Sequence, residues 1–353
     1  MQTLTAGVQW DLYRRALPSI THAIGRTPVV RLNRVTEGSS PSIYVKLEWY
    51  GPSGSLKDRI YLYMVEQAET RGDLRPGMEI LECSTGNAGI ACSFISAVKG
   101  YPCTIVMPEG MSEERKKIMR AYGADLVFTP GGESDVDLSL RKLSEIRAAA
   151  PDRYWTPGQF DNPDNVEAHF LTTGPEIWEQ LGDRLGAFVG AVGSGGGLSG
   201  IGQYLRQRNS SIKVYAVEPD ECALLARREW GSHGIEGIGD GFVPGNLDLS
   251  LLSGVITTTT AESVEMARRL AREEGIFCGI SSGCNVAAAV KLAARHPELP
   301  SILVLVNDTG QRYFSTALCG VEKHVDVPDR EHPIDERSAS ETRKYQDRWE
   351  IIT

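Results

Sequence analysis

Short apolar stretches alternate with amphipathic stretches along almost the whole chain. The apolar stretches have the length of buried β-strands, and they cover residues 43–47, 78–81, 103–107, 125–128, 187–192, 213–217, 255–259 and 302–306. Helical periodicity between them predicts helices from Lys57, over 87–99, after a cap at Ser112, over 135–149, from Leu198 and over 261–274. This alternation predicts an α/β protein with two twisted, mostly parallel sheets that carry helices on both faces.

Turn-forming residues between 151 and 163 mark the expected crossing from one sheet to the other. The charged tail after Pro328 ends in Trp349-Glu350-Ile351-Ile352. We expect a surface extension there, with a terminal helix docked by Trp349.

Composition narrows the class of protein. The chain of 353 residues has a net charge of −9, which disfavours duplex nucleic acid or an anionic membrane as the main partner. No apolar run approaches the length of a membrane span, and residues 1–20 lack the apolar block of a signal peptide. The seven cysteines and six histidines show no metal-binding spacing. These features predict a cytoplasmic protein without a metal.

Lys57 is the strongest candidate for chemistry. It follows the turn Ser53-Gly54-Ser55-Leu56 at the start of a predicted helix, where the helix dipole disfavours a positive charge. A lysine with a lowered pKa can act as a nucleophile and move protons. A solvated lysine after a flexible turn is the plainer interpretation.

The glycine-rich segment Gly193-Ser194-Gly195-Gly196-Gly197 lies between a predicted strand and a predicted helix. Consecutive backbone N–H groups at a helix start form a phosphate-binding cup. The phosphate could belong to a dinucleotide, since residues 195–200 match GxGxxG and Glu218 follows at the spacing of a ribose-binding acid.

Two further strand-to-helix loops have binding potential. Ser84, Thr85, Gly86 and Asn87 could bind a carboxylate, although hydroxyls at such positions also serve as helix caps. Small residues around Ser281 could let a planar ring approach the backbone, or could simply begin a helix.

Together these motifs resemble the cysteine synthase/cystathionine β-synthase family of fold type II pyridoxal-phosphate enzymes, and most of all its O-acetylserine sulfhydrylase-like cysteine synthases. The likeness covers about residues 20–320 and disfavours the dinucleotide interpretation. The segments that carry it are 24–28, 54–59, 84–87, 172–177, 193–197, 237–239, 279–283 and 308–313.

The resemblance implies a role for each matching residue. Lys57 is similar to the lysine that forms the internal aldimine with pyridoxal 5′-phosphate and then moves the substrate Cα proton. Asn87 is similar to the residue beside the ring hydroxyl, and Ser281 to the partner of the pyridine nitrogen. The residues matching the phosphate site are Gly193, Ser194, Gly195, Gly196 and Gly197, and those matching the substrate site are Ser84, Thr85, Gly86, Asn87, Gln159 and Gly237.

A serine at the pyridine nitrogen does not keep that nitrogen protonated, so the ring is a weak electron sink that favours loss of a β-substituent. The family therefore implies β-replacement on an O-activated L-serine, O-acetyl- or O-phospho-L-serine, through an α-aminoacrylate. The product would be L-cysteine or a β-substituted alanine.

Four positions depart from the usual cysteine synthase pattern. Ala88, Ser194 and Gly197 stand where threonine is usual, although Ser194 keeps the hydroxyl, and Asp240 stands where a small residue is usual. A carboxylate at 240 would repel sulfide and favour an amine or a neutral thiol as the second substrate, unless it points to solvent or caps a turn.

The family implies the fold of the tryptophan synthase β-subunit, with a smaller, mobile substrate-binding domain over residues 49–157. Residues 1–48 and 158–328 would form a larger cofactor-binding domain, followed by a charged tail over 329–353. A homodimer is expected. The alternatives are a cystathionine β-synthase-like or specialised-metabolite synthase, a serine/threonine dehydratase, and a catalytically silent relative. The presence of Lys57, Asn87 and Ser281 disfavours the silent relative.

Overall fold

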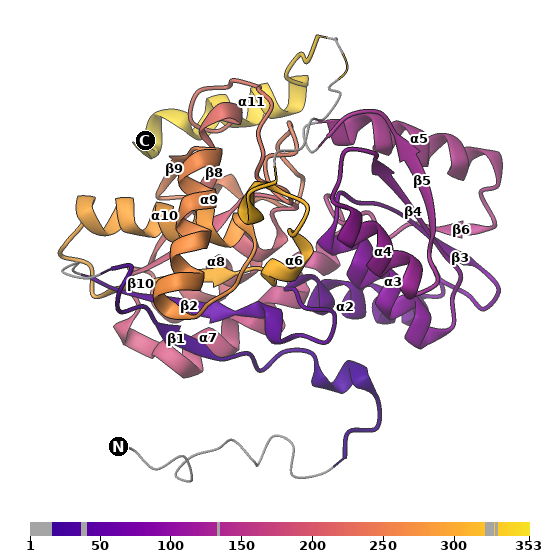
Figure 1. Ribbon diagram of the computed structural model, residues 1–353, viewed down its shortest axis with the longest axis horizontal. Coiled ribbons are helices and arrows are strands. Elements are labelled where there is room, and N and C mark those ends of the chain that lie inside the picture. Colours follow the sequence, from indigo (N-terminus) through magenta and orange to yellow (C-terminus); the bar gives the residue numbers. More distant parts are fainter. Residues whose placement is uncertain (1–15, 37–40, 133–134, 322–327, 329–330) are drawn as a thin grey trace.

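The computed structural model describes residues 16–36, 41–132, 135–321, 328 and 331–353. Residues 1–15 lie outside the described residues, and they include most of the N-terminal segment expected to lack a signal peptide. Residues 329–330 of the tail also lie outside them. The strands form a larger and a smaller sheet, which lie side by side with their helices (Figure 1).

The larger sheet has the strand order β1-β2-β10-β7-β8-β9-β11. Its strands are β1 (Val29–Arg31), β2 (Ser42–Leu47), β7 (Ala187–Ala191), β8 (Lys213–Pro219), β9 (Gly254–Thr258), β10 (Ser301–Val306) and β11 (Glu350–Ile352). All neighbouring strands run parallel except the edge pair β1 and β2. The predicted parallel α/β architecture is confirmed.

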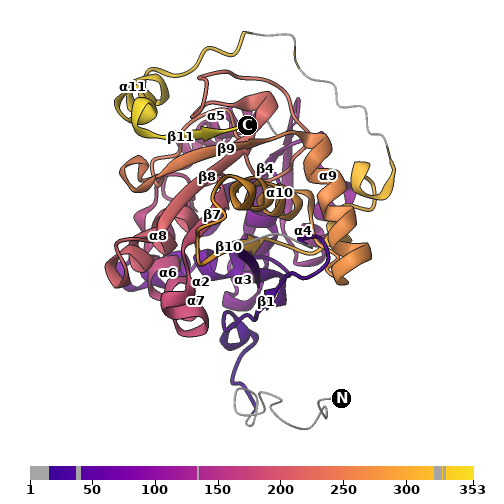
Figure 2. The same cartoon turned by 90° about the vertical axis from the view of Figure 1, so that its left-hand side faces the viewer.

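Alternate side chains of the larger sheet enter two apolar cores. In β10, Val304 and Val306 pack toward α9 (Thr260–Arg269) and α10 (Ile280–Arg295). Leu303 and Leu305 pack on the other face, with α7 (Thr173–Leu181) and α8 (Gly196–Arg208). Figure 2 shows these helices on the two sides of the sheet. Strands buried on both faces explain the continuous apolar runs in the sequence.

The smaller sheet has the order β5-β4-β3-β6 and is parallel throughout. Its strands are β3 (Glu79–Cys83), β4 (Cys103–Pro108), β5 (Asp125–Thr129) and β6 (Tyr154–Trp155). One face packs on α2 (Lys57–Arg71), α3 (Asn87–Lys99) and α4 (Glu113–Ala121), and the other on α5 (Val136–Ala149). Helix α6 (Pro163–Leu171) then lies against both α2 and α8.

The C-terminal tail differs from the expected surface extension. Residues 336–345 form helix α11, and β11 adds a parallel strand to β9 at the edge of the larger sheet. Trp349 is buried, as expected of a docking residue, in the core that also contains α7 and α8. The sequence gives no indication of β11, because a strand of three residues is too short to show a period.

Two helix ends also differ from the predictions. Helix α9 ends at Arg269 and continues as a π-helical turn to Glu274, and α8 begins at Gly196 rather than Leu198. Ser112 precedes α4 but makes no side-chain cap; its hydroxyl instead donates to the carbonyl of Arg312 at 2.9 Å. In the part of the chain that the structure describes, no helix is both long and apolar enough to cross a membrane.

Candidate active site

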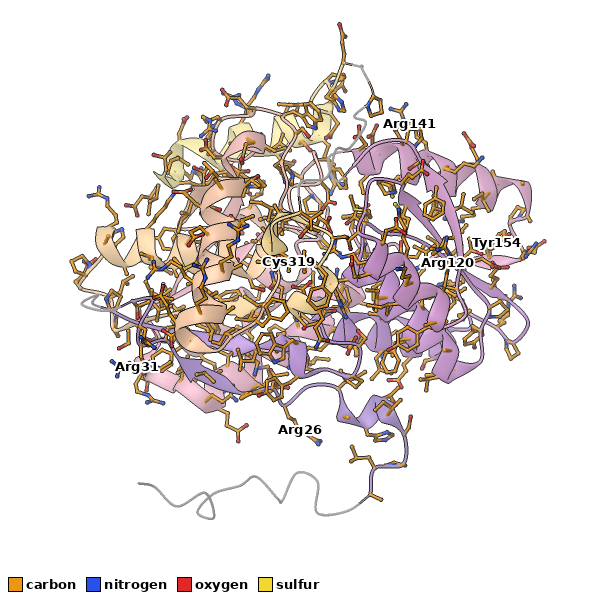
Figure 3. All side chains as sticks on the ribbon, viewed as in Figure 1. Arg26, Arg31, Arg120, Arg141, Tyr154 and Cys319 are labelled. Carbon is orange, nitrogen blue, oxygen red and sulfur yellow. The ribbon has the colours of Figure 1, made fainter. Side chains whose placement is uncertain are left out.

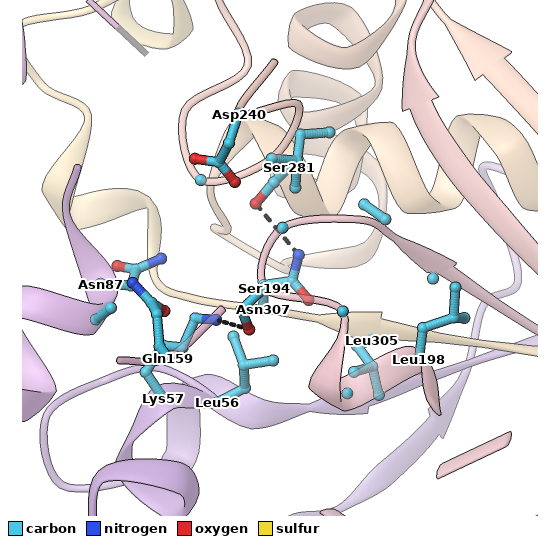
Figure 4. Close-up of a pocket in the computed structure, with 18 of the residues that line it drawn as sticks. Leu56, Lys57, Asn87, Gln159, Ser194, Leu198, Asp240, Ser281, Leu305 and Asn307 are labelled. Carbon is cyan, nitrogen blue, oxygen red and sulfur yellow. Dashed lines mark hydrogen bonds between the residues drawn. The ribbon is translucent and has the colours of Figure 1, made fainter. Parts of the chain in front are cut away.

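A cavity lies where the carboxyl ends of strands from both sheets meet, the position expected for a ligand site in an α/β protein. It is lined by every predicted site residue except Gly196, which begins α8 beside it. Figure 4 shows Lys57, Asn87, Gln159, Ser194, Asp240 and Ser281 arranged around it.

Lys57 is the first residue of α2, as predicted, and its Nζ donates to Ser194 Oγ at 3.3 Å. Burial lowers the pKa of the Lys57 ammonium to about 8, although the negative charges of Asp240 and Glu82 act in the opposite direction. The main cause of the lowered Lys57 pKa is the loss of solvation, rather than the helix dipole that the sequence indicates. With a pKa of about 8, part of the Lys57 amine is neutral near pH 7.5.

The turn before Lys57 is held by the buried carboxylate of Asp58. Asp58 accepts from the backbone N–H of Ser53 at 2.8 Å and from the Ser53 hydroxyl. Gly54 has a φ of +83°, which favours glycine, and its Cα faces the Arg312 guanidinium. This turn directs Lys57 into the cavity.

The segment 193–197 forms a cup at the start of α8. Gly195 has a φ of +78°, and a Cβ there would lie 2.8 Å from the backbone N of Leu247. A Cβ on Gly197 would have no atom nearer than 3.6 Å, since this Cα faces the open cavity. The first N–H groups of α8 have no partner within the helix. The cup therefore fits a phosphate group.

The loop 83–89 connects β3 to α3. Ser84 Oγ accepts from the N–H of Gly86 at 3.0 Å and of Gly89 at 2.7 Å, so this hydroxyl orders the start of α3. Thr85 also lines the cavity, and Gln159 donates to the carbonyl of Cys83 at 3.3 Å. The loop brings N–H groups at a helix start to the cavity, which suits a carboxylate.

Both ends of the Asn87 amide are hydrogen-bonded. Its Nδ2 donates to Asp308 at 2.7 Å, and its Oδ1 accepts from Arg312. These partners, on the segment after β10, orient the amide at the rim of the cavity.

Ser281 lies in the first turn of α10, with its hydroxyl accepting from Asn307 Nδ2 at 3.2 Å. Both residues line the cavity. Asn285, one turn further along α10, donates to the carbonyl of Leu305 at 2.9 Å and accepts from the N–H of Ala191 at 2.8 Å. These bonds fix α10 against the ends of β7 and β10.

Asp240 is 8% exposed and lines the cavity, so it neither points to solvent nor serves only as a turn cap. Burial raises the pKa of its carboxyl to about 6, while the positive charge of Lys57 opposes the rise. Among the lining residues that the structure describes, Asp240 is the only acid.

Three residues at or next to the cavity are not predicted from the sequence: Asn165, His169 and Asn307. Asn165 lies behind the glycine-rich cup, where its Nδ2 donates to Ser194 Oγ at 3.0 Å. His169 lines the cavity beside Gly197 as a neutral imidazole, because burial lowers its pKa to about 3. Neither belongs to a motif. Asn307 does carry a signal, because it is the first polar residue after the apolar strand β10, at the edge where ligands bind.

Comparison with known proteins identifies the class of this site. A family model described as "Pyridoxal-phosphate dependent enzyme" matches residues 20–308, so the chain belongs to the family of pyridoxal-phosphate-dependent enzymes. A cysteine synthase of Staphylococcus aureus is 42% identical over 306 residues, which cover 86% of this chain and 98% of that protein.

Solved structures give the same result. A variant of O-ureido-L-serine synthase with O-ureido-L-serine bound is 42% identical, with a TM-score of 0.82 over 88% of this chain and 97% of that chain. A cysteine synthase from Entamoeba histolytica is 38% identical, with a TM-score of 0.82 over 88% and 93%. A hydrogen sulfide-producing enzyme from Fusobacterium nucleatum is 36% identical, with a TM-score of 0.81 over 84% and 100%.

The cofactor of this family is pyridoxal phosphate, and the cavity fits it. The glycine cup suits the phosphate, Lys57 suits the aldehyde, and Ser281 offers a neutral hydroxyl to the ring. Asn165 supports the cup, since its side chain lies against Gly196 and its Nδ2 donates to Ser194 Oγ at 3.0 Å.

Proposed function

We propose that this protein catalyses pyridoxal-phosphate-dependent β-replacement on an O-activated L-serine, O-acetyl- or O-phospho-L-serine, giving L-cysteine or a β-substituted alanine. The observation that carries the proposal is the 3.3 Å contact between Lys57 Nζ and Ser194 Oγ, which puts a low-pKa amine at the glycine cup. The relatives named cysteine synthase and O-ureido-L-serine synthase support the same reaction class.

Each site residue then has a proposed role. Lys57 binds the cofactor covalently and moves the proton at the substrate Cα. Asn87 contacts the ring hydroxyl, and Ser281 the ring nitrogen. The cofactor phosphate contacts Gly193, Ser194, Gly195, Gly196 and Gly197, and the substrate contacts Ser84, Thr85, Gly86, Asn87, Gln159 and Gly237.

The bound cofactor withdraws electrons from the Cα of the amino acid. Ser281 limits this withdrawal, since a hydroxyl does not hold the ring nitrogen protonated as a carboxylate would. Lys57 takes the Cα proton, and the β-substituent leaves. A positioned base of this kind contributes roughly 10²–10⁴-fold to the rate.

An absorbance spectrum of the purified protein tests the proposal. We expect a visible band that shifts when O-acetyl-L-serine is added and that is absent from Lys57→Ala. A colourless wild-type protein after incubation with pyridoxal phosphate would refute the proposal.

Asp240 favours a second candidate, a cystathionine β-synthase-like or specialised-metabolite synthase that uses a thiol or amine. A buried carboxylate facing Lys57 repels an anionic acceptor and attracts a neutral or cationic one. Both candidates replace the β-substituent of an L-serine derivative, and Asp240 bears on the choice of acceptor.

The two sheets support a division into a smaller, mobile unit over 49–157 and a larger unit over 1–48 and 158–328. The tail expected over 329–353 is not separate from the larger unit, because β11 pairs with β9. We also propose a homodimer, as the resemblance to cysteine synthases implies. None of the cysteines that the structure describes forms a disulfide, and one of them, Cys319, is exposed (Figure 3). Cysteines in the thiol form support a cytoplasmic location.

A further inference from the structure

Arg115 is a buried cation that the proposed reaction does not use. It lies in the first turn of α4, beside the smaller sheet, and its side chain is 1% exposed. Its guanidinium forms an ion pair with Glu236, and Asp308 Oδ2 lies further away, 4.0 Å from Nη2. Its Nη2 donates to the Tyr313 hydroxyl at 2.6 Å.

The same guanidinium supports the loop 83–89 from behind. A Cβ on Gly86 would lie 2.5 Å from Arg115 Nε and 2.6 Å from Cδ. A side chain at position 86 would therefore clash with Arg115, which packs against the Gly86 Cα. Any movement of Arg115 releases the loop that carries Ser84, Thr85 and Asn87.

Glu236 belongs to the other side of the cavity. It immediately precedes the segment 237–240, from which Gly237, Ile238 and Asp240 line the cavity. Its side chain is 12% exposed, so the ion pair with Arg115 is largely shielded from water. A shielded pair is weakened little by salt, and loss of one partner leaves a buried charge.

The contact thus joins the two loops that cover the cavity. Ser84, Thr85 and Asp240 are only 2%, 7% and 8% exposed, so an amino acid that enters between these loops must part them. The Arg115–Glu236 pair is the direct ionic link across that opening.

We propose that Arg115 and Glu236 form a clasp that closes loop 83–89 and the segment 236–240 over the substrate, and that both are positioning residues. This inference rests on the proposed β-replacement. With the clasp closed, the three-carbon fragment of the donor that remains after the β-substituent has left stays in the cavity until the second substrate reacts with it. With the clasp open, that fragment is lost to hydrolysis: O-acetyl-L-serine and water give acetate, pyruvate, ammonium and one proton.

The test compares Arg115→Met, Glu236→Gln and the double variant as holoenzymes, with O-acetyl-L-serine and sulfide as probes. We expect the KM for O-acetyl-L-serine to rise about tenfold in each single variant, with a larger fraction of pyruvate in the product. The double variant should be no worse than either single variant, because both changes open the same contact. Additive effects, or an unchanged pyruvate fraction, would overturn the clasp.

Arg120→Met is the matched control. Arg120 lies on the same helix, exposed (Figure 3), with its guanidinium 5.8 Å from the Phe128 ring centroid. This variant should keep the wild-type KM and product ratio.

Hydrogen exchange tests the contact between the two loops independently of the reaction. In Glu236→Gln, the amides of loop 83–89 should exchange faster, although the substitution lies in the other loop. Unchanged exchange there contradicts the clasp, even if Arg115→Met fails to fold. If wild-type enzyme releases no acetate, the proposed donor is wrong, while the exchange result still decides whether the two loops are coupled.

Discussion

At the scale of single residues, burial sets the charges that matter. Lys57 and Asp240 face one cavity, and burial moves the pKa of the lysine down to about 8 and that of the acid up to about 6. Near neutral pH both are therefore mostly charged, and each raises the ionised fraction of the other. Substitution of one therefore changes the titration of its partner.

The first prediction concerns capture of pyridoxal phosphate by the cofactor-free protein. Because the neutral amine is the nucleophile, the capture rate should rise about tenfold per pH unit below 8 and level off above it. In Asp240→Asn the plateau should begin at lower pH, since the carboxylate that raises the Lys57 pKa is gone. Stopped-flow absorbance measures the rate, with N-acetyl-lysine as the reagent control. A rate that does not depend on pH between 6 and 9 would contradict a buried, titrating Lys57.

The second prediction concerns the acceptor. Removal of the negative charge in Asp240→Ala should raise turnover with sulfide relative to turnover with amines or larger thiols. Asp240→Asn keeps the size of the side chain and should show the same change. If only the alanine variant changes the preference, space rather than charge selects the acceptor.

At the scale of elements, the sequence predicted those structures whose apolar period is long. Helix α3 occupies the predicted range 87–99, and the buried strands follow their apolar runs to within two residues. The sequence could not predict β11 or the π-helical turn after Arg269, because their formation depends on packing against distant segments. Asn165 and Arg115 were missed for the same reason: their partners are 29 and 121 residues away in the chain.

The third prediction concerns the tail. Trp349 is 6% exposed and stacks on Tyr345 with a centroid distance of 6.2 Å just before β11. Trp349→Ala should destabilise the larger unit by about 3–5 kcal/mol, measured by urea unfolding. Ile351→Ala, at a position 38% exposed, should cost much less. Equal stability of both variants and the wild type would show that the tail is not part of the core.

At the scale of the whole molecule, a buried acid behind the site links the stability of the fold to pH. Glu82, at the end of β3, is buried and accepts from the Tyr61 hydroxyl at 3.0 Å and from the N–H of Cys83 at 2.8 Å. Burial raises the pKa of this carboxyl from 4.5 to about 7. Glu82 thus places a titrating group behind loop 83–89.

The fourth prediction follows from that rise. The folded protein binds the Glu82 proton more tightly than the unfolded chain, so this contribution to stability is complete below pH 4.5 and is lost as the pH rises through 7. The melting temperature of Glu82→Gln relative to wild type should therefore increase between pH 5 and pH 7.5. A constant difference would mean that Glu82 does not titrate in this range.

The most direct test of the account is to reduce the holoenzyme with borohydride and to map the labelled peptide. The account predicts one pyridoxyl group, on the Nζ of Lys57, and no label in Lys57→Ala. A label on another lysine, or none in the wild-type protein, would contradict the proposed site.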